Sequence, residues 1–384
     1  MTPEITELVQ TLHDNRGRVV LVTAGAGSQA LAWILGVPGA SRTLLEALVP
    51  YDWAAFDDFL GQTPDKYVAA STARLMAGRA FSRARWLHRA EDHLVGLACT
   101  AAIVTDRPKR GAHRAHIATW QMERIVWQRL ELEKGARERA AEEDLVSRLM
   151  LNALARAFGI PSALSLPLGA GDSLDTNATD LVTLARQVYR HQIRCFQLQA
   201  DGMANGQPMG PLLILSGSFN PLHEGHLQLA RVASSITGRP PTFELTAVNA
   251  EKPALAEADI LQRMAQFAGR WAVLVSNAPT FVAKAEIYPG AIFAVGFDTA
   301  VRVLQPRFYE GSEARMTAAL ARMRELGCRF LVAGREDEAG NFHEASSLNV
   351  PAAFADLFQP IPSRRFRLDI SSTHLRATGQ RGSR

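Results

Sequence analysis

Two histidines, His223 and His226, follow an apolar run at 212–215 and a turn containing glycine, asparagine and proline. A helical pattern continues over 227–235. A strand, a glycine-containing turn and a helix in that order direct backbone N–H groups and a positive helix end toward one point, which attracts phosphate. Because residues three apart share one face of a helix, both imidazoles can donate hydrogen bonds to phosphate oxygens. Further phosphate contacts are expected in the turn itself, at Gly217, Ser218 and Phe219.

A second group of polar residues lies near the end of the chain, where Ser371, Ser372 and Thr373 precede Arg376. Hydroxyl and free N–H groups at a helix start can hold phosphate oxygens, and an arginine adds a bidentate guanidinium. Taken alone, three hydroxyl residues in a row also serve as an ordinary helix cap.

Together the two motifs resemble those of nucleotidyltransferases of the HxGH class, and within that class the nicotinamide-mononucleotide adenylyltransferases. The first motif is G-S-F-N-P-L-H-E-G-H at 217–226, and the second is I-S-S-T-H-L-R at 370–376. They lie about 145 residues apart, and their joint occurrence in this order is more specific than either motif alone. The resemblance covers 211–384 and implies a Rossmann-like parallel-sheet domain.

The resemblance implies transfer of an adenylyl group from ATP, accompanied by Mg²⁺, to nicotinamide mononucleotide, giving NAD and pyrophosphate. His223, His226 and Arg376 would be the catalytic residues. The remaining substrate or ATP contacts would come from Gly217, Ser218, Phe219, Lys252, Gly296, Asp298, Ser371, Ser372 and Thr373.

Several alternatives stay open for this C-terminal part. Asp298 could cap the following helix, and Lys252 could be a solvated loop lysine. The enzyme could use CTP or another phosphate acceptor on the same fold. A nucleotide sensor without turnover is a further alternative, although the intact histidines and Arg376 disfavour it.

The composition of the 384 residues is that of a soluble globular chain, with 47% hydrophobic and 21% charged residues. No apolar run reaches the ~18 residues of a membrane span, and the start of the chain lacks a signal-peptide pattern. Three separated cysteines favour a reducing cytoplasm and disfavour a zinc site. A net charge of +4 fits small anionic nucleotides as partners, without nucleic acid or membrane.

The pattern of the chain predicts an α/β protein of two domains, at 1–165 and 211–384, joined at 166–210 by a connector helix (180–198) and a linker. Strands are expected at 212–215, 243–248, 272–275, 291–295 and 329–332. Helices are expected at 226–236, 257–268 and 312–326. This alternation predicts a parallel sheet, with ligands bound beyond the carboxyl ends of its strands.

The N-terminal part also begins with a strand and a glycine turn, at 19–23 and 24–30. The turn satisfies the dinucleotide fingerprint G-x-G-x-x-A, with candidate ligand residues Gly25, Gly27 and Ser28. The acidic residue about twenty positions later is Glu46, in a pattern at 44–48 that we interpret as helical, which disfavours dinucleotide binding.

Segments within 5–160 resemble the CinA C-terminal family of nicotinamide-nucleotide amidohydrolases. They are V-P-G-A-S at 37–41, V-P-Y at 49–51, S-T-A-R-L-M-A at 71–77 and G-L-A-C-T at 96–100. The family's catalytic serine would fall near Ala24 or Gly25 and its lysine near Phe56, so that only Tyr51 remains.

We therefore expect a CinA-like domain that binds a nucleotide or serves as a scaffold. Ser28 is either a displaced nucleophile or a hydroxyl at a helix start, and in the first case the protein is bifunctional. Tyr51 is either a site residue or a core aromatic. A turn containing Lys109, Arg110, His113 and Arg114 either binds phosphate or is solvated. A strand at 126–134 and a helix at 138–158 are interpreted as scaffold or as the face of a homo-oligomer.

Overall fold

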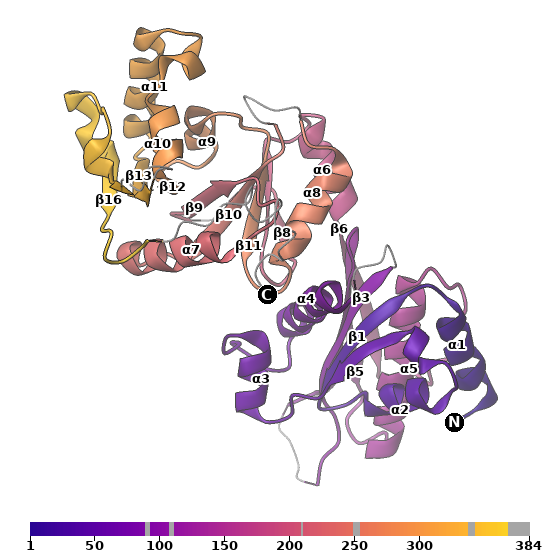
Figure 1. Ribbon diagram of the computed structural model, residues 1–384. Helices are drawn as coiled ribbons and strands as arrows, with labels where there is room; N and C mark the ends of the chain where they lie inside the picture. The colour runs from indigo at the N-terminus through magenta and orange to yellow at the C-terminus, as the bar shows by residue number, and fades with distance from the viewer. Residues whose placement is uncertain (89–92, 107–110, 209, 249–253, 337–341, 368–384) are drawn as a thin grey trace. The chain divides into compact units, whose positions relative to one another are not determined.

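The computed structural model describes all residues except 89–92, 107–110, 209, 249–253, 337–341 and 368–384. The chain forms two compact units, each of which contains both helices and strands (Figure 1). Unit 1 comprises Met1–Val182 with the short segments 200–203 and 267–270, and unit 2 comprises the rest. The interval 166–210, expected to be a connector and linker, is therefore divided between the units.

Unit 1 is built on a six-stranded sheet of order β2-β1-β3-β4-β5-β6. The first three strands of this order are parallel, and β4, β5 and β6 add antiparallel pairs. Successive residues of β3 and β4, which point to opposite faces of the sheet, are nearly all buried. Strands that are covered on both faces show this pattern. The strands are β1 Arg18–Ala24, β2 Leu44–Leu48, β3 Leu94–Ala102, β4 His113–Trp120, β5 Arg124–Leu132 and β6 Ser173–Asp180.

Helices cover both faces of this sheet. α4 packs against β1, β3 and β4, and α5 packs on the opposite face, where α1 and α2 join it (Figure 1). Residues such as Leu8, Ile34 and Leu149 from α1, α2 and α5 form one buried cluster with β1, β3 and β4. The helices are α1 Pro3–Asp14, α2 Ser28–Gly36, α3 Trp53–Leu60, α4 Ala70–Leu87 and α5 Arg139–Ala157.

Two expectations for unit 1 were wrong. The segment Leu44–Leu48 is strand β2, paired in parallel with β1, and Glu46 forms an ion pair with Arg83 instead of lying at a ligand site. His113 and Arg114 begin strand β4, and His113 Nδ1 lies 2.8 Å from the buried carboxylate of Glu142. Lys109 and Arg110 lie outside the described residues. The expected strand at 126–134 and helix at 138–158 are confirmed as β5 and α5.

Unit 2 contains an eight-stranded sheet of order β16-β13-β12-β9-β10-β11-β7-β8. The six strands from β16 to β11 are parallel, and the order reverses between β9 and β12. Such a reversal opens a crevice beyond the carboxyl ends of the two strands. The parallel strands are β9 Leu213–Gly217, β10 Pro241–Thr246, β11 Ala272–Ser276, β12 Ile292–Gly296, β13 Arg329–Ala333 and β16 Phe358–Ile361.

Helices between these strands supply the core of unit 2. Buried residues of α9, α10 and α11 cluster with Ile214, Phe293 and Phe330 of the sheet, whereas α7 packs against β9 and β10. The helices are α6 Leu181–Tyr189, α7 Glu224–Thr237, α8 Glu257–Met264, α9 Phe281–Ile287, α10 Phe297–Val303 and α11 Glu313–Glu325. All five strands and all three helices expected for 211–384 are confirmed.

The expected connector helix at 180–198 is only half helical. After α6, residues Cys195–Leu198 form strand β7, which pairs antiparallel with β11, and Ala204–Asn205 form β8. Phe196 of β7 is fully buried. A short hairpin, β14 Arg335–Glu336 and β15 Phe342–His343, completes the strands of unit 2.

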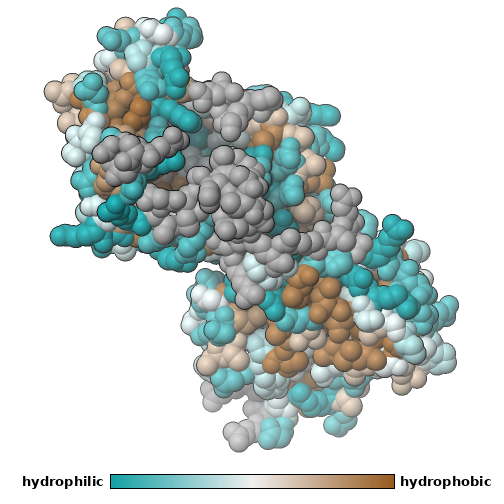
Figure 2. All heavy atoms as spheres, in the orientation of Figure 1, coloured by the Kyte–Doolittle hydropathy of each residue, from teal (hydrophilic) through white to brown (hydrophobic). Residues whose placement is uncertain are grey.

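No helix among the described residues is both long and apolar enough to cross a bilayer. Figure 2 shows hydrophobic residues, in brown, gathered on the visible face of unit 1. The exposed large hydrophobic side chains of this unit include Val49, Tyr51 and Trp53. The association of copies of the chain into a homo-oligomer stays a prediction.

A buried ion pair crosses the interior of unit 2. Lys284 Nζ lies 2.7 Å from Glu244 Oε2, and neither side chain is appreciably exposed. Ser276 Oγ donates to the other carboxylate oxygen at 2.5 Å, and Lys284 also donates to Thr246 Oγ1 at 2.9 Å. A buried charge of this kind is tolerated only while its partner is present.

We predict that Lys284→Met destabilises unit 2 by about 3–5 kcal/mol, because it leaves Glu244 as an uncompensated buried charge. Hydrogen exchange of peptides from β10 would measure the loss of unfolding free energy. The double variant Glu244→Gln with Lys284→Met is the matched control, since the introduced amide keeps an acceptor for Ser276 without the charge. The prediction fails if the single variant is as stable as the double one.

Candidate functional site

A cavity of about 930 Å³ opens in unit 2 at the carboxyl ends of β9, β12 and β13. This is the place at which the strand order reverses, as the alternation of the sequence predicts. The cavity brings together five residues that the sequence singled out: Phe219, His223, His226, Gly296 and Asp298.

The other expected site residues fall outside this lining. Gly217 ends β9, and a Cβ atom there would lie 2.8 Å from the ring of Phe219, so the close approach of that ring requires glycine. Ser218 contributes its backbone carbonyl to Arg263 at 3.1 Å. Lys252, Ser371, Ser372, Thr373 and Arg376 lie outside the described residues, so their roles stay predictions.

The two histidines stack on each other at the start of α7. Their ring centroids are 3.7 Å apart with an interplanar angle of 28°, and Phe219 meets His226 edge-on at 5.0 Å. The backbone N–H of His223 donates to Nδ1 of His226 at 3.2 Å. Because Nδ1 of His226 accepts this bond, the proton of its neutral ring is on Nε2, which is left to donate.

Both imidazoles are held neutral. Burial, together with a smaller effect of the neighbouring His223, lowers the pKa of His226 to about 3. Burial also lowers the pKa of His223. A neutral imidazole can donate one hydrogen bond to a phosphate oxygen, and the negative charge of a bound phosphate would favour protonation of either ring.

Three buried polar atoms of the cavity wall have no hydrogen-bond partner among the described residues. They are Ser216 Oγ, His223 Nδ1 and Gln305 Oε1. Buried polar groups in native proteins are nearly always paired with protein, water or a ligand. Their convergence on one cavity therefore marks it as a place for a polar ligand.

The cavity is also more basic than the motifs alone indicated. Arg302, Arg307 and Arg335 line it together with the two histidines, against the carboxylates of Asp298 and Glu336. Arg335 was not among the site residues expected from the sequence. The sequence could have indicated it, because Arg335 follows the end of β13 by two residues. Segments just beyond the carboxyl ends of parallel strands line such clefts.

Asp298 lies in the first turn of α10, where Gly296 is the N-cap residue. Its carboxylate pairs with Arg335, and both side chains are about half exposed. Asp298 thus does not cap α10, and its carboxylate would have to exchange Arg335 for any substrate hydroxyl. Beside it, Phe297 and His343 stack at 5.3 Å and 23°, forming a flat aromatic wall.

A smaller cavity of about 190 Å³ lies in unit 1 at the ends of β1 and β3. It brings together Ala24, Gly25, Tyr51 and Phe56, the positions at which the CinA resemblance places a serine, a tyrosine and a lysine. Trp53 and Tyr67 add aromatic walls, with ring centroids 5.2 Å apart.

A nucleophile at position 25 is excluded by the backbone. Gly25 has a φ of +88°, and a Cβ atom there would lie 2.0 Å from the carbonyl oxygen of Ala101. Ala24 and Phe56 offer no titratable group, and Tyr51 is 68% exposed, so it is not a core aromatic. No serine or lysine is among the residues that line this part of the described structure.

Ser28 and Gly27 are used inside the protein instead. The carboxylate of Glu143 accepts hydrogen bonds of 3.0 Å from Gly27 N, Gln29 N and Ser28 Oγ. Glu143 is nearly buried and so provides the negative charge that the start of α2 attracts. A phosphate at this turn would have to displace that carboxylate, which disfavours the expected nucleotide site at Gly27 and Ser28.

No family model and no curated protein matches the chain. Among solved structures, the competence/damage inducible protein CihA from Agrobacterium tumefaciens is 18% identical with a TM-score of 0.32, covering 42% of this chain and 98% of that one. A CinA superfamily protein from Enterobacter cloacae is 16% identical with a TM-score of 0.33, covering 42% and 95%. Each covers less than half of this chain.

The low pKa of His226 predicts an acid-sensitive unit 2. The pKa of His226 in the folded protein, about 3, lies below the ordinary value of 6.5. Neutral His226 therefore contributes to the free energy of unfolding fully above pH 6.5, and this contribution is lost as the pH falls toward 3. One such group changes the unfolding free energy by up to about 1.4 kcal/mol per pH unit.

His226→Gln removes the titration and keeps an acceptor for the His223 N–H. We expect the difference in unfolding free energy between the wild type and this variant to shrink by about 1–2 kcal/mol between pH 7 and pH 5. Hydrogen exchange of β9 peptides at both pH values would measure it. A difference that stays constant with pH would show that His226 titrates normally.

Proposed function

We propose that unit 2 is a nucleotidyltransferase that joins ATP and nicotinamide mononucleotide to give NAD and pyrophosphate. The observation that supports this most is the stacked, neutral pair His223 and His226 at the start of α7, facing a basic cavity at the carboxyl ends of parallel strands. The HxGH resemblance of the turn that positions them supports the same reaction.

In this proposal a phosphate oxygen of the mononucleotide attacks the α-phosphorus of ATP, and pyrophosphate leaves. The reaction requires two anions to be brought together and their charge offset, with little covalent participation by the protein. His226 Nε2–H and the N–H groups at the start of α7 would donate to the triphosphate, where charge develops in the transition state. Arg302, Arg307 and Arg335 would reduce the repulsion between the two substrates.

Residues outside the described ranges complete the proposal. Lys252 would approach the acceptor phosphate, and Ser371, Ser372, Thr373 and Arg376 would hold the ATP phosphates. Asp298 would bind a ribose hydroxyl or the nicotinamide after releasing Arg335.

Magnesium would accompany the nucleotide. No cluster of three or more metal-ligating side chains occurs within the described ranges, so the donors there fit an ion that keeps mainly phosphate and water ligands. Asp298 and Glu336 are the carboxylates in the cavity that could contact such an ion or its waters. When bound, Mg²⁺ would offset the charge on the phosphate oxygens.

For unit 1 we propose ligand binding without hydrolysis. The aromatic cavity at Tyr51, Trp53 and Tyr67 suits a planar ring, whereas Ala24, Gly25 and Phe56 supply neither nucleophile nor base. A serine nucleophile needs an adjacent base, and Ser28 bonds to Glu143 outside the cavity lining.

We predict that His226→Ala lowers the rate of pyrophosphate release from ATP and nicotinamide mononucleotide by about a hundredfold or more. A donor that acts mainly in the transition state is typically worth about 2.7–4 kcal/mol. Arg231→Ala is the matched control on the same helix, because Arg231 is exposed, pairs with Glu224 and is not among the cavity residues. Unchanged turnover in a folded His226→Ala protein would refute the proposed site.

The same assay with CTP in place of ATP, or with other mononucleotides, distinguishes the proposed substrates from alternatives on the same fold. Nucleotide binding without pyrophosphate release under any combination would identify a sensor instead.

We also predict that the full chain releases no ammonia from nicotinamide mononucleotide, since the unit 1 cavity lacks the family's serine and lysine. His226→Ala should be assayed in parallel, so that consumption of the mononucleotide by unit 2 does not mask slow hydrolysis. Ammonia release that Ser28→Ala or Tyr51→Phe abolishes would instead make the chain bifunctional.

A further inference from the structure

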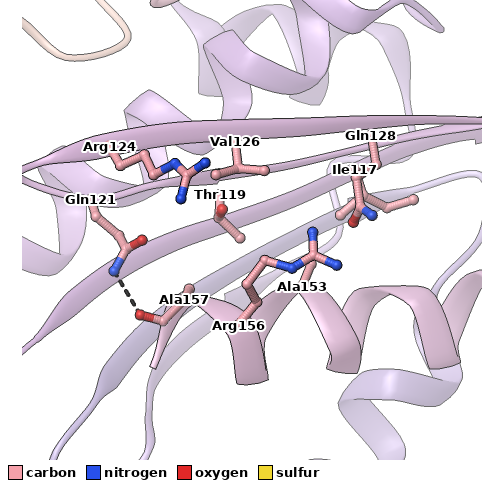
Figure 3. A pocket seen from close by; sticks show the side chains of 9 residues that line it. All are labelled: Ile117, Thr119, Gln121, Arg124, Val126, Gln128, Ala153, Arg156 and Ala157. Atoms are coloured by element: carbon pink, nitrogen blue, oxygen red, sulfur yellow. Dashed lines mark hydrogen bonds between the residues drawn. The ribbon is translucent and has the colours of Figure 1, made fainter. Parts of the chain in front are cut away.

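A small polar pocket of about 40 Å³ lies in unit 1 between the last turns of α5 and strands β4 and β5 (Figure 3). It is separate from the aromatic cavity at Tyr51 and shares no residue with it. Its lining consists of Ile117, Thr119, Gln121, Arg124, Val126, Gln128, Ala153, Arg156 and Ala157.

The sheet register explains why these residues meet. Ile117 pairs with Gln128 and Thr119 with Val126 across β4 and β5, so all four share one face of the sheet. Arg124 lies two residues before Val126 and therefore points to the same face. Ala153, Arg156 and Ala157, spaced three and four apart, form the facing side of α5.

Two guanidinium groups approach this pocket without a counter-charge. Arg124 and Arg156 both point toward it in Figure 3, and no acidic residue is among its lining. Within the described part of the chain, neither side chain forms an ion pair. Asp180 is the backbone partner of Arg124 in the β5–β6 ladder and is not among the residues that line the pocket. Two unpaired arginines at one concave site suit an oxyanion, which accepts hydrogen bonds from both.

A third residue gives an independent indication of a ligand. Gln128 is only 2% exposed, and its Nε2 donates to Thr176 Oγ1 at 3.2 Å. Its Oε1, by contrast, is buried and has no hydrogen-bond partner. An amide oxygen can only accept, so the missing partner must donate a proton.

We propose that this pocket binds a hydrogen phosphate group, with Arg124 and Arg156 contacting its charged oxygens and its remaining O–H donating to Gln128 Oε1. Phosphate carries such a proton near neutral pH, whereas sulfate carries none. The pocket volume is a few times the 10–15 Å³ that one water needs, which admits a phosphate group but no nucleotide.

The test must report on this pocket alone, because the proposed nucleotide site in unit 2 also attracts phosphate. Phenylglyoxal labelling of the full chain, mapped by peptide mass spectrometry, reports on each arginine separately. Phosphate, sulfate and chloride are compared at equal ionic strength. Arg16 is the internal reference, since it is exposed and lies outside the pocket.

We expect phosphate at about ten times its Kd to lower labelling of both Arg124 and Arg156 roughly tenfold, with Arg16 unchanged. Sulfate should bind about fivefold or more weakly, because it leaves the buried Gln128 oxygen unsatisfied. Arg156→Gln should abolish the protection of Arg124, whereas the matched Arg16→Gln should leave it intact. Gln128→Met should make phosphate and sulfate equivalent.

Equal labelling of Arg124 with and without phosphate would overturn the proposal, as would equal protection by sulfate in the wild type. Protection of Arg124 that persists in Arg156→Gln would equally contradict a shared site. Arg156 is exposed near the end of α5, so its replacement tests the site even if Gln128→Met does not fold. Because the readout is confined to unit 1, none of these outcomes depends on the activity of unit 2.

Discussion

The hydrogen bond from the His223 backbone N–H to Nδ1 of His226 determines the chemistry available at the unit 2 cavity. It satisfies an N–H group at the start of α7 and places the His226 proton on Nε2. It also holds the two rings in their stacked arrangement, where burial keeps them neutral. A pair of charged imidazoles at this distance would repel each other. The neutral pair can instead respond to the charge of a bound phosphate.

The two units use the same local arrangement of strand, glycine turn and helix in opposite ways. In unit 1 the helix start is already neutralised from within, by a carboxylate that comes from α5, more than a hundred residues later in the chain. In unit 2 the corresponding position is occupied by imidazoles, which offer donors without adding negative charge. A helix start thus marks an anion site only where no internal carboxylate occupies it.

Much of unit 2 could be predicted from sequence, because its apolar runs are short, bounded by turns and separated by helical patterns. The placement of His223 and His226 at the start of α7 followed from local spacing, whereas their catalytic role came from the resemblance and stays a prediction. Leu44–Leu48 was mistaken for a helix because its leucines fit both periods in so short a segment. Strand β7 was hidden because the apolar residues after α6 continued the helical pattern. Glu143 could not be assigned to its site, since it reaches the start of α2 through a tertiary contact that no sequence spacing encodes. Arg335 could have been assigned from its place just after β13.

Strands β7 and β8 precede the motif-bearing part of unit 2 in the chain but form one end of its sheet. Residues 195–205 therefore protect β11, whose backbone N–H and C=O groups would otherwise form an open edge. A shortened chain that begins after this segment would keep both histidines and would still present that edge to other molecules. Its expected fate is pairing with other copies and aggregation, so the lower limit of an autonomous unit 2 lies before Cys195 and not at the first phosphate-binding motif.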